Sequence, residues 1–385
     1  MISRYSSLNF NLGETVDMIR DQVNAFARDE IAPRAEQIDI DNEFPSDLWK
    51  KFGDMGLLGM TVEEEYGGVG GDFGHEAVIL MESNRANLAS WGHGIHSGIV
   101  AHYILAYGTE EQKQRWLPKM ITGELVGALA MTEPSTGSDV QRIKTKAVKD
   151  GNVYRLSGQK TFITNGQHAN LILVAAKTDP SEGSKGISLV ALETDGADGF
   201  TRGRNLEKVG LHAADTSELF FDNIAVPPEN ILGGAEGQGF YQMMQQLPQE
   251  RLIIACGAVG AMEGAVERTI AYCKEREAFG GPILQFQNTR FKLAECLTKT
   301  KVARAFLDEC ISELIAGELT VEKAAMAKYW ITDTQGEVLD ECLQLHGGYG
   351  YMQEYAIGEM WVDARVQRIY GGTNEIMKEL ISRSL

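Results

Sequence analysis

The amino-acid sequence predicts an α+β chain with three regions, in the order helices, strands, helices. Apolar residues recur at spacings of three and four over residues 14–123, alternate in short runs over residues 126–231, and then return to the helical spacing. With 385 residues, of which 43% are hydrophobic, the chain is long enough for two or three structural regions. We therefore expect an N-terminal α-helical domain over residues 1–123, a middle β domain over 124–235 and a C-terminal bundle of long antiparallel helices over 236–385.

The N-terminal region begins with an amphipathic helix. Within TVDMIRDQVNAFARDEI, Val16, Ile19, Val23 and Phe26 are three or four residues apart, so they share one helical face. The stretch EEEYGGVGGDFGHE at 63–76 is rich in glycine, but its glycines do not form the G-x-G-x-x-G pattern of a dinucleotide-binding turn. We interpret this stretch as a loop between helices.

The middle region contains five runs with the composition and spacing of β-strands. Turn signals, such as those at 149–152 and 165–166, separate the runs. The expected strands lie at 125–132, 152–164, 169–178, 186–194 and 217–226. In the C-terminal region the long run EKAAMAKYWITDTQGEVLDECLQL has the helical period and predicts one of the bundle helices.

Composition argues against several classes of function. The formal net charge of −18 argues against a surface for nucleic acid or for anionic membranes. The five cysteines are widely spaced, odd in number and without a Cys-x-x-Cys pair, which is typical of buried thiols in a reducing compartment. The chain has no run of about 18 apolar residues and no secretory signal at its N-terminus, so we expect a soluble intracellular protein with no membrane span.

Five separate stretches resemble the acyl-CoA dehydrogenase family. They read ALAMTEPSTGSDVQRIKTKA, QKTFITNG, REAFGGPILQFQ, QLHGGYGY and RIYGGTNEIM, and they occur in the family's order over essentially the whole chain. Each stretch alone is a weak signal, whereas the set is specific. The resemblance is strongest to the long-chain and isovaleryl-CoA dehydrogenase branch. It implies an N-terminal α-helical domain, a central β-barrel-like domain, a C-terminal four-helix bundle and assembly as a homotetramer.

The resemblance also implies a reaction, which is the FAD-dependent removal of two hydrogens across Cα and Cβ of an acyl-CoA thioester. An α-proton next to a thioester is only weakly acidic. The site therefore needs a carboxylate base aimed at Cα and hydrogen-bond donors on the thioester oxygen. In this chemistry the hydride leaves Cβ for the flavin, and the protein sets the geometry.

The implied FAD contacts come from several parts of the chain. After the first strand, short hydroxyl side chains and glycine backbone amides can donate hydrogen bonds to the edge of the flavin ring and to phosphate oxygens. The guanidinium group of an arginine can bind a pyrophosphate with two parallel hydrogen bonds. By pattern alone, Phe162 would be a core residue of a strand and Arg276 a solvated charge on a helix. Many members carry Trp at the position of Phe162, and Phe keeps the stacking face but loses the indole N–H. By resemblance, the FAD contacts are Met131, Thr132, Gly137, Ser138, Phe162, Thr164, Arg276, Phe279, Gln287, Gln344, Gly347, Gly348, Thr373 and Glu375, with those of 276, 279 and 287 made across a subunit contact.

The catalytic base departs from the commonest family pattern. Many members carry it directly after the tyrosine of the tail motif, but here Gly371 follows Tyr370. The long-chain and isovaleryl branch takes the base from the start of the C-terminal bundle, and Glu250 in LPQERL matches that position. By itself, a glutamate beside an arginine near a helical proline is usually part of a surface pair. We interpret Glu250 as the base, and we expect burial to raise its pKa toward neutrality.

The resemblance places the substrate near this base. Gly371 and Gly372 would let the thioester and the flavin lie against bare backbone, with Tyr370 as a wall. The alternative interpretation is a helix-entry turn capped by Thr373. The implied substrate contacts are Ser138, Arg251, Tyr370, Gly371, Gly372, Gly94 and Gly98.

The acyl chain is the least determined part of the substrate. Small residues at Gly94 and Gly98 would leave depth for a long or branched chain, or they would serve helix packing equally well. We favour a long straight chain, and the alternative is a branched or terpenoid chain of the isovaleryl or citronellyl type. His93 and His96 are three residues apart without Cys, Asp or Glu at ligand spacing, so we expect packing or pocket lining and no metal.

Electron-transfer flavoprotein is the electron acceptor that the resemblance implies, within fatty-acid β-oxidation and lipid metabolism. Two other functions stay open. An acyl-CoA oxidase would be reoxidised directly by dioxygen, and a non-catalytic acyl-CoA-binding flavoprotein would carry Glu250 as a bystander surface charge. We expect a cytoplasmic location in a bacterium or, after removal of a transit peptide, a location in the mitochondrial matrix.

Overall fold

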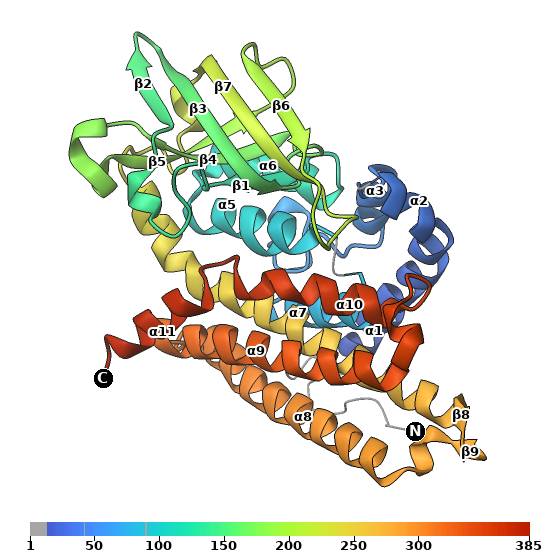
Figure 1. The fold of residues 1–385 in the computed structure, drawn as a ribbon. Helices are drawn as coiled ribbons and strands as arrows, with labels where there is room; N and C mark the ends of the chain where they lie inside the picture. Colours follow the sequence, from blue (N-terminus) through green and yellow to red (C-terminus); the bar gives the residue numbers. More distant parts are fainter. Residues whose placement is uncertain (1–13, 42, 89–90) are drawn as a thin grey trace.

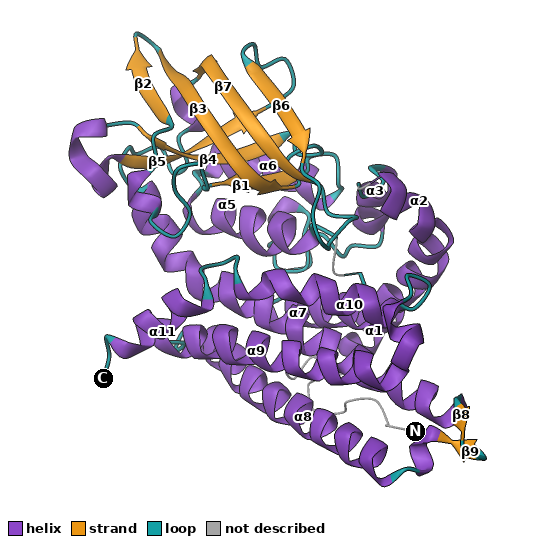
Figure 2. Ribbon diagram, viewed as in Figure 1, coloured by secondary structure: helices purple, strands orange, loops and turns teal. Residues whose placement is uncertain are grey.

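The computed structural model describes residues 14–41, 43–88 and 91–385. Residues 1–13 lie outside that part. The prediction that the chain lacks a secretory signal depends on these residues. Figure 1 shows a β domain at one end of the molecule, helices of the N-terminal region beneath and beside it, and the long C-terminal helices along the other end. The long strands all belong to the middle region (Figure 2).

Helices and short turns build the N-terminal region around an aromatic cluster. The ring centroids of Phe52 and Trp91 are 3.9 Å apart, and those of Phe26 and Phe52 are 4.9 Å apart. Ile19, Val23 and Phe26 are buried, as their spacing predicts. The helices are α1 (Glu14–Phe26), α2 (Ala35–Asp41), α3 (Asp47–Asp54), α4 (Phe73–Arg85), α5 (His102–Tyr107) and α6 (Glu110–Ile121), and the π-helix Gly94–Ala101 leads directly into α5.

The middle region forms one curled sheet. The strand order is β1-β4-β2-β3-β7-β6, and β5 pairs with β4. The register of β3 against β7 shifts between Leu156 and Gly158 and again between Lys160 and Ile163, and such irregularities bend and twist a sheet. The strands are β1 (Gly127–Ala130), β2 (Lys146–Asp150), β3 (Val153–Thr164), β4 (Leu171–Lys177), β5 (Ile187–Glu193), β6 (Phe200–Asn205) and β7 (Thr216–Val226).

Two of these strands, β2 and β6, were not predicted from the sequence. In β2 only Ala147 is buried, and β6 has no fully buried residue. Both strands therefore lack the apolar alternation by which strands are recognised, and they are held by backbone pairing with β3 and β7.

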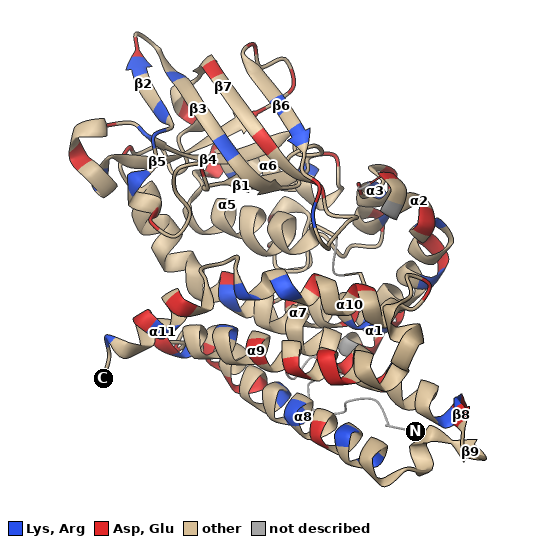
Figure 3. Ribbon diagram, in the orientation of Figure 1, with Lys and Arg blue, Asp and Glu red and all other residues tan. Residues whose placement is uncertain are grey.

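The C-terminal region consists of long helices that pack side by side. Helix α7 contains Pro248 without ending there, and it crosses from beneath the sheet to the far end of the bundle (Figure 1). The elements are α7 (Gly239–Glu275), β8 (Glu277–Ala278), β9 (Gly281–Pro282), α8 (Gln287–Ala316), α9 (Val321–His346), α10 (Ala356–Ala364) and α11 (Asn374–Ser382). Figure 3 shows acidic and basic residues interspersed along α8 and α9, where Lys292 pairs with Glu341 and Lys299 with Glu337.

This architecture confirms the predicted fold class, with a helical domain, a curled β domain and a helical domain in that order. The exact domain boundaries at 123/124 and 235/236 stay a prediction. Within the part of the chain that the structure describes, no helix combines the length and apolar character needed to cross a membrane.

Candidate active site

Glu250 is buried in α7, not on the surface as an isolated Glu-Arg pair would suggest. Its side chain is 5% exposed, and the hydroxyl of Tyr103 on α5 donates a 2.7 Å hydrogen bond to its Oε1. Burial raises the pKa of Glu250 to about 7, while the Tyr103 hydrogen bond and the charge of Arg251 oppose this rise. A carboxyl group with this pKa can exchange a proton near neutral pH.

Arg251 is buried beside Glu250 with much of its hydrogen-bonding capacity unused. It is 4% exposed, and its Nε and one terminal nitrogen have no hydrogen-bond partner. Burial and, next, the charge of Arg251 lower the pKa of Lys328 on α9 to about 8. Lys328 donates to the carbonyl of Gly372 at 2.7 Å and to Oδ1 of Asn374 at 2.9 Å. Lys328 therefore holds the tail turn, and Arg251, whose charge acts on Lys328, has donors free for a ligand.

The tail turn has the backbone that its glycines predict. Gly371 and Gly372 have φ values of +63° and +87°, which side-chain-bearing residues rarely adopt. A Cβ added at Gly371 would lie 2.3 Å from Cδ1 of Ile254, so Gly371 lies directly against α7. Ile254 is one helical turn beyond Glu250, and residues four apart lie on the same face of a helix. The tail turn therefore lies along the α7 face that carries Glu250.

The remaining residues of the tail motif lie at the same place. Tyr370 is 40% exposed. The Thr373 hydroxyl accepts a hydrogen bond from the amide of Ile376 and caps α11, as one of the two interpretations of this turn expects. Glu375 is exposed in the first turn of α11, where hydrogen bonds from its own backbone amide and from the Thr373 side chain lower its pKa.

A second group of predicted residues surrounds the end of β1 and the bulged part of β3. The amide of Thr161 donates to the carbonyl of Thr132 at 3.0 Å, which brings Met131 and Thr132 beside Phe162 and Thr164. Phe162 is not a core residue: it is 67% exposed and has φ of +59°, an uncommon conformation for a residue with a side chain. Gly137 and Ser138 are exposed in the following loop.

A buried ion pair supports this loop, and the sequence did not predict it. Nζ of Lys160 donates to the carbonyl of Met131 at 2.8 Å and to Oε1 of Glu133 at 3.0 Å. The carboxylate of Glu133 also accepts hydrogen bonds from the amides of Lys144 and Thr145. Both residues lie within stretches that carry the family resemblance, but nothing in either stretch shows that they face each other across β1 and β3.

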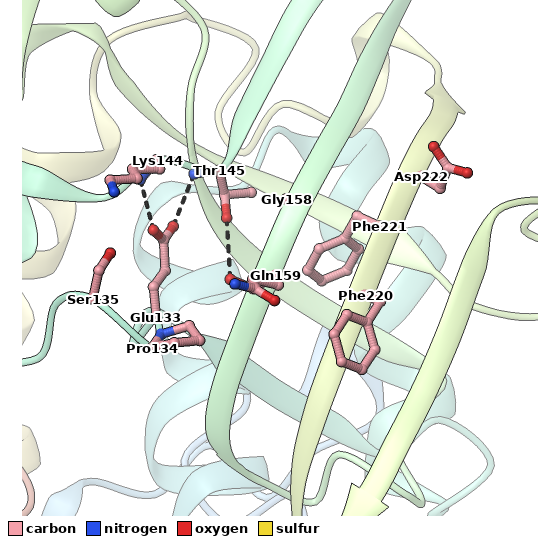
Figure 4. Close-up of a pocket in the computed structure, with 10 residues that line it drawn as sticks. All are labelled: Glu133, Pro134, Ser135, Lys144, Thr145, Gly158, Gln159, Phe220, Phe221 and Asp222. Carbon is pink, nitrogen blue, oxygen red and sulfur yellow. Dashed lines mark hydrogen bonds between the residues drawn. The ribbon is translucent and has the colours of Figure 1, made fainter.

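Figure 4 shows the pocket next to this ion pair. It has a volume of about 530 Å³ and opens between the loop at 133–135 and the strands β3 and β7. Phe220 and Asp222 form its far side, and Glu250 is not among its lining residues. It is therefore separate from the α7 face that carries Glu250.

A third group of predicted residues lies at the opposite end of the bundle. Arg276 lies 5.5 Å from the ring centroid of Tyr349, which brings the β8–β9 hairpin beside the turn after α9 that contains Gly347 and Gly348. Phe279 at the tip of the hairpin is 97% exposed with φ of +52°. Gln287 and Gln344 are exposed at the adjoining ends of α8 and α9.

This third group cannot meet the first two within one chain. Lys328, which holds the tail turn, and Gly347 are separated by most of α9, a distance of roughly 28 Å at 1.5 Å per residue. In Figure 1 the β8–β9 hairpin and the β domain lie at opposite sides of the molecule. The predicted cofactor residues thus form two sets on one protomer.

The two histidines have structural surroundings. Nδ1 of His96 accepts a hydrogen bond from the amide of Gly127, and its Nε2 lies 3.1 Å from the carbonyl of Met120, so His96 ties the N-terminal helices to β1. His93 is buried with Nδ1 3.5 Å from Oε1 of Glu76. Among the described residues, no three His, Cys, Asp or Glu side chains gather in a way that could hold a metal ion.

Comparison with known proteins establishes the family. Models of the acyl-CoA dehydrogenase N-terminal, middle and C-terminal domains match residues 13–124, 128–224 and 237–385. The mitochondrial long-chain specific acyl-CoA dehydrogenase of Sus scrofa is 46% identical over 371 residues, which are 96% of this chain and 86% of that protein. The mitochondrial isovaleryl-CoA dehydrogenase of Solanum tuberosum is 40% identical over 375 residues, which are 97% of this chain and 90% of that protein. The crystal structure of an acyl-CoA dehydrogenase from Geobacillus kaustophilus has a TM-score of 0.93 at 48% identity and covers 96% of this chain and 98% of its own.

The chain belongs to the acyl-CoA dehydrogenase family, as the five stretches predicted. It is an FAD-dependent oxidoreductase acting on acyl-CoA, in a flavoprotein family involved in fatty-acid oxidation. The residues present suit FAD. Phe162 and Phe279 expose aromatic faces on backbone of positive φ, and a Cβ at Gly137, Gly347 or Gly348 would meet nothing within 4 Å.

Proposed function

We propose that the protein is a long-chain acyl-CoA dehydrogenase in which Glu250 removes the α-proton of the substrate and the product is a trans-2-enoyl-CoA. The observation that carries this proposal is the burial of Glu250, with its pKa near 7, on the α7 face that also meets the tail turn. The tail position where many members carry the base is Gly371, so Glu250 is the carboxylate that remains for this role.

In this mechanism each residue of the chain has a defined task. One carboxylate oxygen of Glu250 takes the proton from Cα, while Tyr103 holds the other oxygen and fixes the orientation of the group. The unused donors of Arg251 lie next to Glu250, where they would offset negative charge that develops on the thioester. FAD, when bound, would supply the acceptor for the hydride from Cβ, so that loss of the proton and of the hydride together would account for the new double bond. Phe162, Thr164, Met131 and Thr132 would hold its ring.

We propose that two protomers share each FAD, because the two sets of cofactor residues lie too far apart to hold one FAD within a protomer; the homotetramer is the assembly that the family resemblance implies. Arg276, Phe279 and Gln287, with Gln344, Gly347 and Gly348, would contact the adenosine and pyrophosphate part of an FAD whose ring is held by the neighbouring protomer. Gly137 and Ser138 would belong to the set that faces the ring and the pyrophosphate. Thr373 and Glu375, which the resemblance assigns to the adenine dinucleotide portion of FAD, lie at the tail turn. The exposure of Phe279 is consistent with a partner surface over the hairpin.

The substrate class is inferred from relatives and from the small residues near the base. A long-chain relative at 46% identity and an isovaleryl relative at 40% identity favour a long straight chain, with a branched chain as the second candidate. Gly98 is buried with Ile253 against it, so it also has the packing role that was the alternative interpretation. We propose electron-transfer flavoprotein as the acceptor that reoxidises the enzyme. The location in the cell stays a prediction.

The test is an anaerobic titration of the purified flavoprotein with saturated acyl-CoA thioesters of graded length and branching, followed by flavin absorbance. The wild type is expected to bleach with long chains, and Glu250→Gln is expected to bind substrate with at least about 100-fold slower bleaching, the lower range for loss of a general base. Glu263→Gln is the matched control, because Glu263 is equally buried on α7 but bonds to Arg304. Equal bleaching by wild type and Glu250→Gln would refute the base assignment, and rapid peroxide formation in air would favour an oxidase.

A further inference from the structure

Lys328 on α9 is a buried lysine to which the proposed mechanism gives no task. Two lysines of the described chain are buried, Lys160 and Lys328, and Lys160 forms an ion pair with Glu133. Lys328 forms no ion pair with any described residue. It donates instead to two uncharged oxygens, the carbonyl of Gly372 and Oδ1 of Asn374. A buried charge without a counter-charge is costly, so its presence calls for a specific explanation.

The charges around Lys328 make its position more costly still. Burial and, next, the charge of Arg251 on α7 lower the pKa of Lys328 to about 8. The negative charges of Asp333 on α9 and Glu375 on α11 oppose this effect less strongly. Like charges disfavour each other where water does not screen them. Electrostatics alone would therefore favour a neutral side chain here, and the reason for the lysine lies in its hydrogen bonds.

Asn374 aims the ammonium group of Lys328. Asn374 is buried, and its Nδ2 donates to Oγ1 of Thr332 at 3.0 Å and to Oδ1 of Asp333 at 2.9 Å. These bonds fix the amide so that its Oδ1 accepts a hydrogen bond from Lys328 at 2.9 Å. Thr332 is four residues beyond Lys328, on the same face of α9. Nζ of Lys328 is thereby placed 2.7 Å from the carbonyl of Gly372.

The turn that Lys328 holds contains two adjacent glycines, and glycine has the greatest conformational freedom of all residues. The bare backbone lets Gly371 lie directly against Ile254 on α7. The same freedom means that the glycines do not restrain the turn themselves. The hydrogen bond from Lys328 supplies a restraint from the side of α9. The turn is therefore fixed between α9 and the α7 face that carries Glu250.

We propose that Lys328 is a positioning residue for the reaction: its bond to the carbonyl of Gly372 keeps the tail turn against the α7 face that carries Glu250. The acyl-CoA then presents its Cα to the carboxylate in one geometry. This inference rests on the proposed function, because it takes Glu250 as the base. Lys328 itself transfers no proton and acts through the turn alone.

The test follows anaerobic flavin reduction at increasing concentrations of a saturated long-chain acyl-CoA, which separates the maximal rate from the half-saturating concentration. Lys328→Met removes both hydrogen bonds and leaves a side chain of similar length. It should lower the maximal rate by about 100-fold, the effect of a misplacement of about 1 Å, with little change in the half-saturating concentration. Lys328→Arg keeps the charge and the donors, so it should recover most of the maximal rate.

Thr332→Val is the matched control for a loss of stability. Thr332 is buried on the same face of α9 and bonds to Asn374, but it does not bond to the carbonyl of Gly372. Urea unfolding gives the stability of each protein. Thr332→Val should be less stable than the wild type and keep the wild-type maximal rate, because the bond from Lys328 to the turn remains.

Two results would overturn the inference and leave the proposed function intact. One is a wild-type maximal rate in Lys328→Met, and the other is an equal loss of rate in Lys328→Met and Thr332→Val. If Lys328→Met does not fold, Lys328→Gln takes its place, and equal maximal rates in Lys328→Gln and Lys328→Arg would refute the role of the bond. A wild type that no acyl-CoA bleaches would refute the proposed function, and this inference with it.

Discussion

The hydroxyl of Tyr103 donates a 2.7 Å hydrogen bond to Oε1 of Glu250, although the two residues are 147 positions apart in the chain. Both side chains are buried. Burial raises the pKa of Glu250, and the hydrogen bond, which favours the ionised carboxylate, limits this rise to about 7. The pair therefore sets the pH range in which the proposed base is ionised.

Tyr103→Phe should move the acidic limb of the pH–rate profile to higher pH by about one unit, because a hydrogen bond of about 1.5 kcal/mol to a charged group equals about one pKa unit. The carboxylate is the active form, so the variant should lose activity at pH 6.5 and keep it at pH 9. The measurement is the rate of anaerobic flavin reduction against pH. Tyr107→Phe is the control, since the Tyr107 hydroxyl bonds to Gln246 and not to Glu250. An unshifted limb in Tyr103→Phe would contradict the coupling.

Glu76 should make the folded state less stable as pH rises. Its pKa rises from 4.5 to about 8 on folding, so between these values the unfolded chain has released a proton that the folded chain keeps. Stability then falls by about 1.4 kcal/mol per pH unit from this group, and the effect is absent below pH 4.5. Urea unfolding at pH 5, 6.5 and 8 should show a shallower decline for Glu76→Gln than for wild type. The exposed control Glu111→Gln should follow wild type, and parallel curves for all three proteins would count against the prediction.

Gly371→Ala should be more destabilising than a glycine substitution that strains the backbone alone. Gly317 has a similar φ of +73° with nothing within 4 Å, so Gly317→Ala should cost about 1 kcal/mol. Gly371→Ala adds the overlap with Ile254 and should cost about 2–4 kcal/mol. Ile254→Val removes Cδ1, so it should recover the overlap part in the double variant. Equal unfolding free energies for the two single glycine variants would show that Ile254 and α7 can move aside without loss of stability.

Lys160→Met should weaken both folding and flavin retention. The Lys160 side chain is fully buried, and removing one partner of a buried ion pair costs about 3–5 kcal/mol. The loop from Met131 also loses a hydrogen bond, so the purified variant should contain less FAD per chain. Lys146→Met on the exposed side of β2 is the control and should change stability by less than about 0.5 kcal/mol. Full flavin content in Lys160→Met would show that the ion pair does not support the loop.

Phe279→Ala should reduce assembly and FAD content while leaving the fold of the protomer intact. Phe279 is 97% exposed in the described chain, so its loss removes almost no packing within the protomer. Sedimentation velocity gives the assembly state, and absorbance gives the flavin per chain. Tyr241→Ala, at an exposed position on the first turns of α7, should behave as wild type. If Phe279→Ala forms a tetramer with full FAD content, the hairpin contributes neither to assembly nor to FAD binding.

Local patterns predicted the elements whose side chains carry the signal. The buried strands β4 and β5 and the long helix α9 have apolar residues at the expected spacing, because burial on a regular element imposes that spacing. The sequence did not predict strands β2 and β6, because backbone pairing holds them in the sheet and backbone pairing leaves no apolar pattern in the sequence. The same reasoning was wrong about the burial of Phe162. Alternation within β3 predicts that Phe162 lies in the core, whereas a shift in the register of β3 turns it outward.

The sequence by itself determined the order of the three regions, the family and the position of the proposed base, because each depends on residues that are near neighbours in the chain. Only the tertiary structure decided what surrounds that base. Tyr103 reaches Glu250 from another domain, Gly371 meets Ile254, and Glu76 is left without a partner on a closely packed helix pair. Ionisation and hydrogen bonding depend on distance and on exclusion of water, and folding sets both among residues that the sequence keeps far apart.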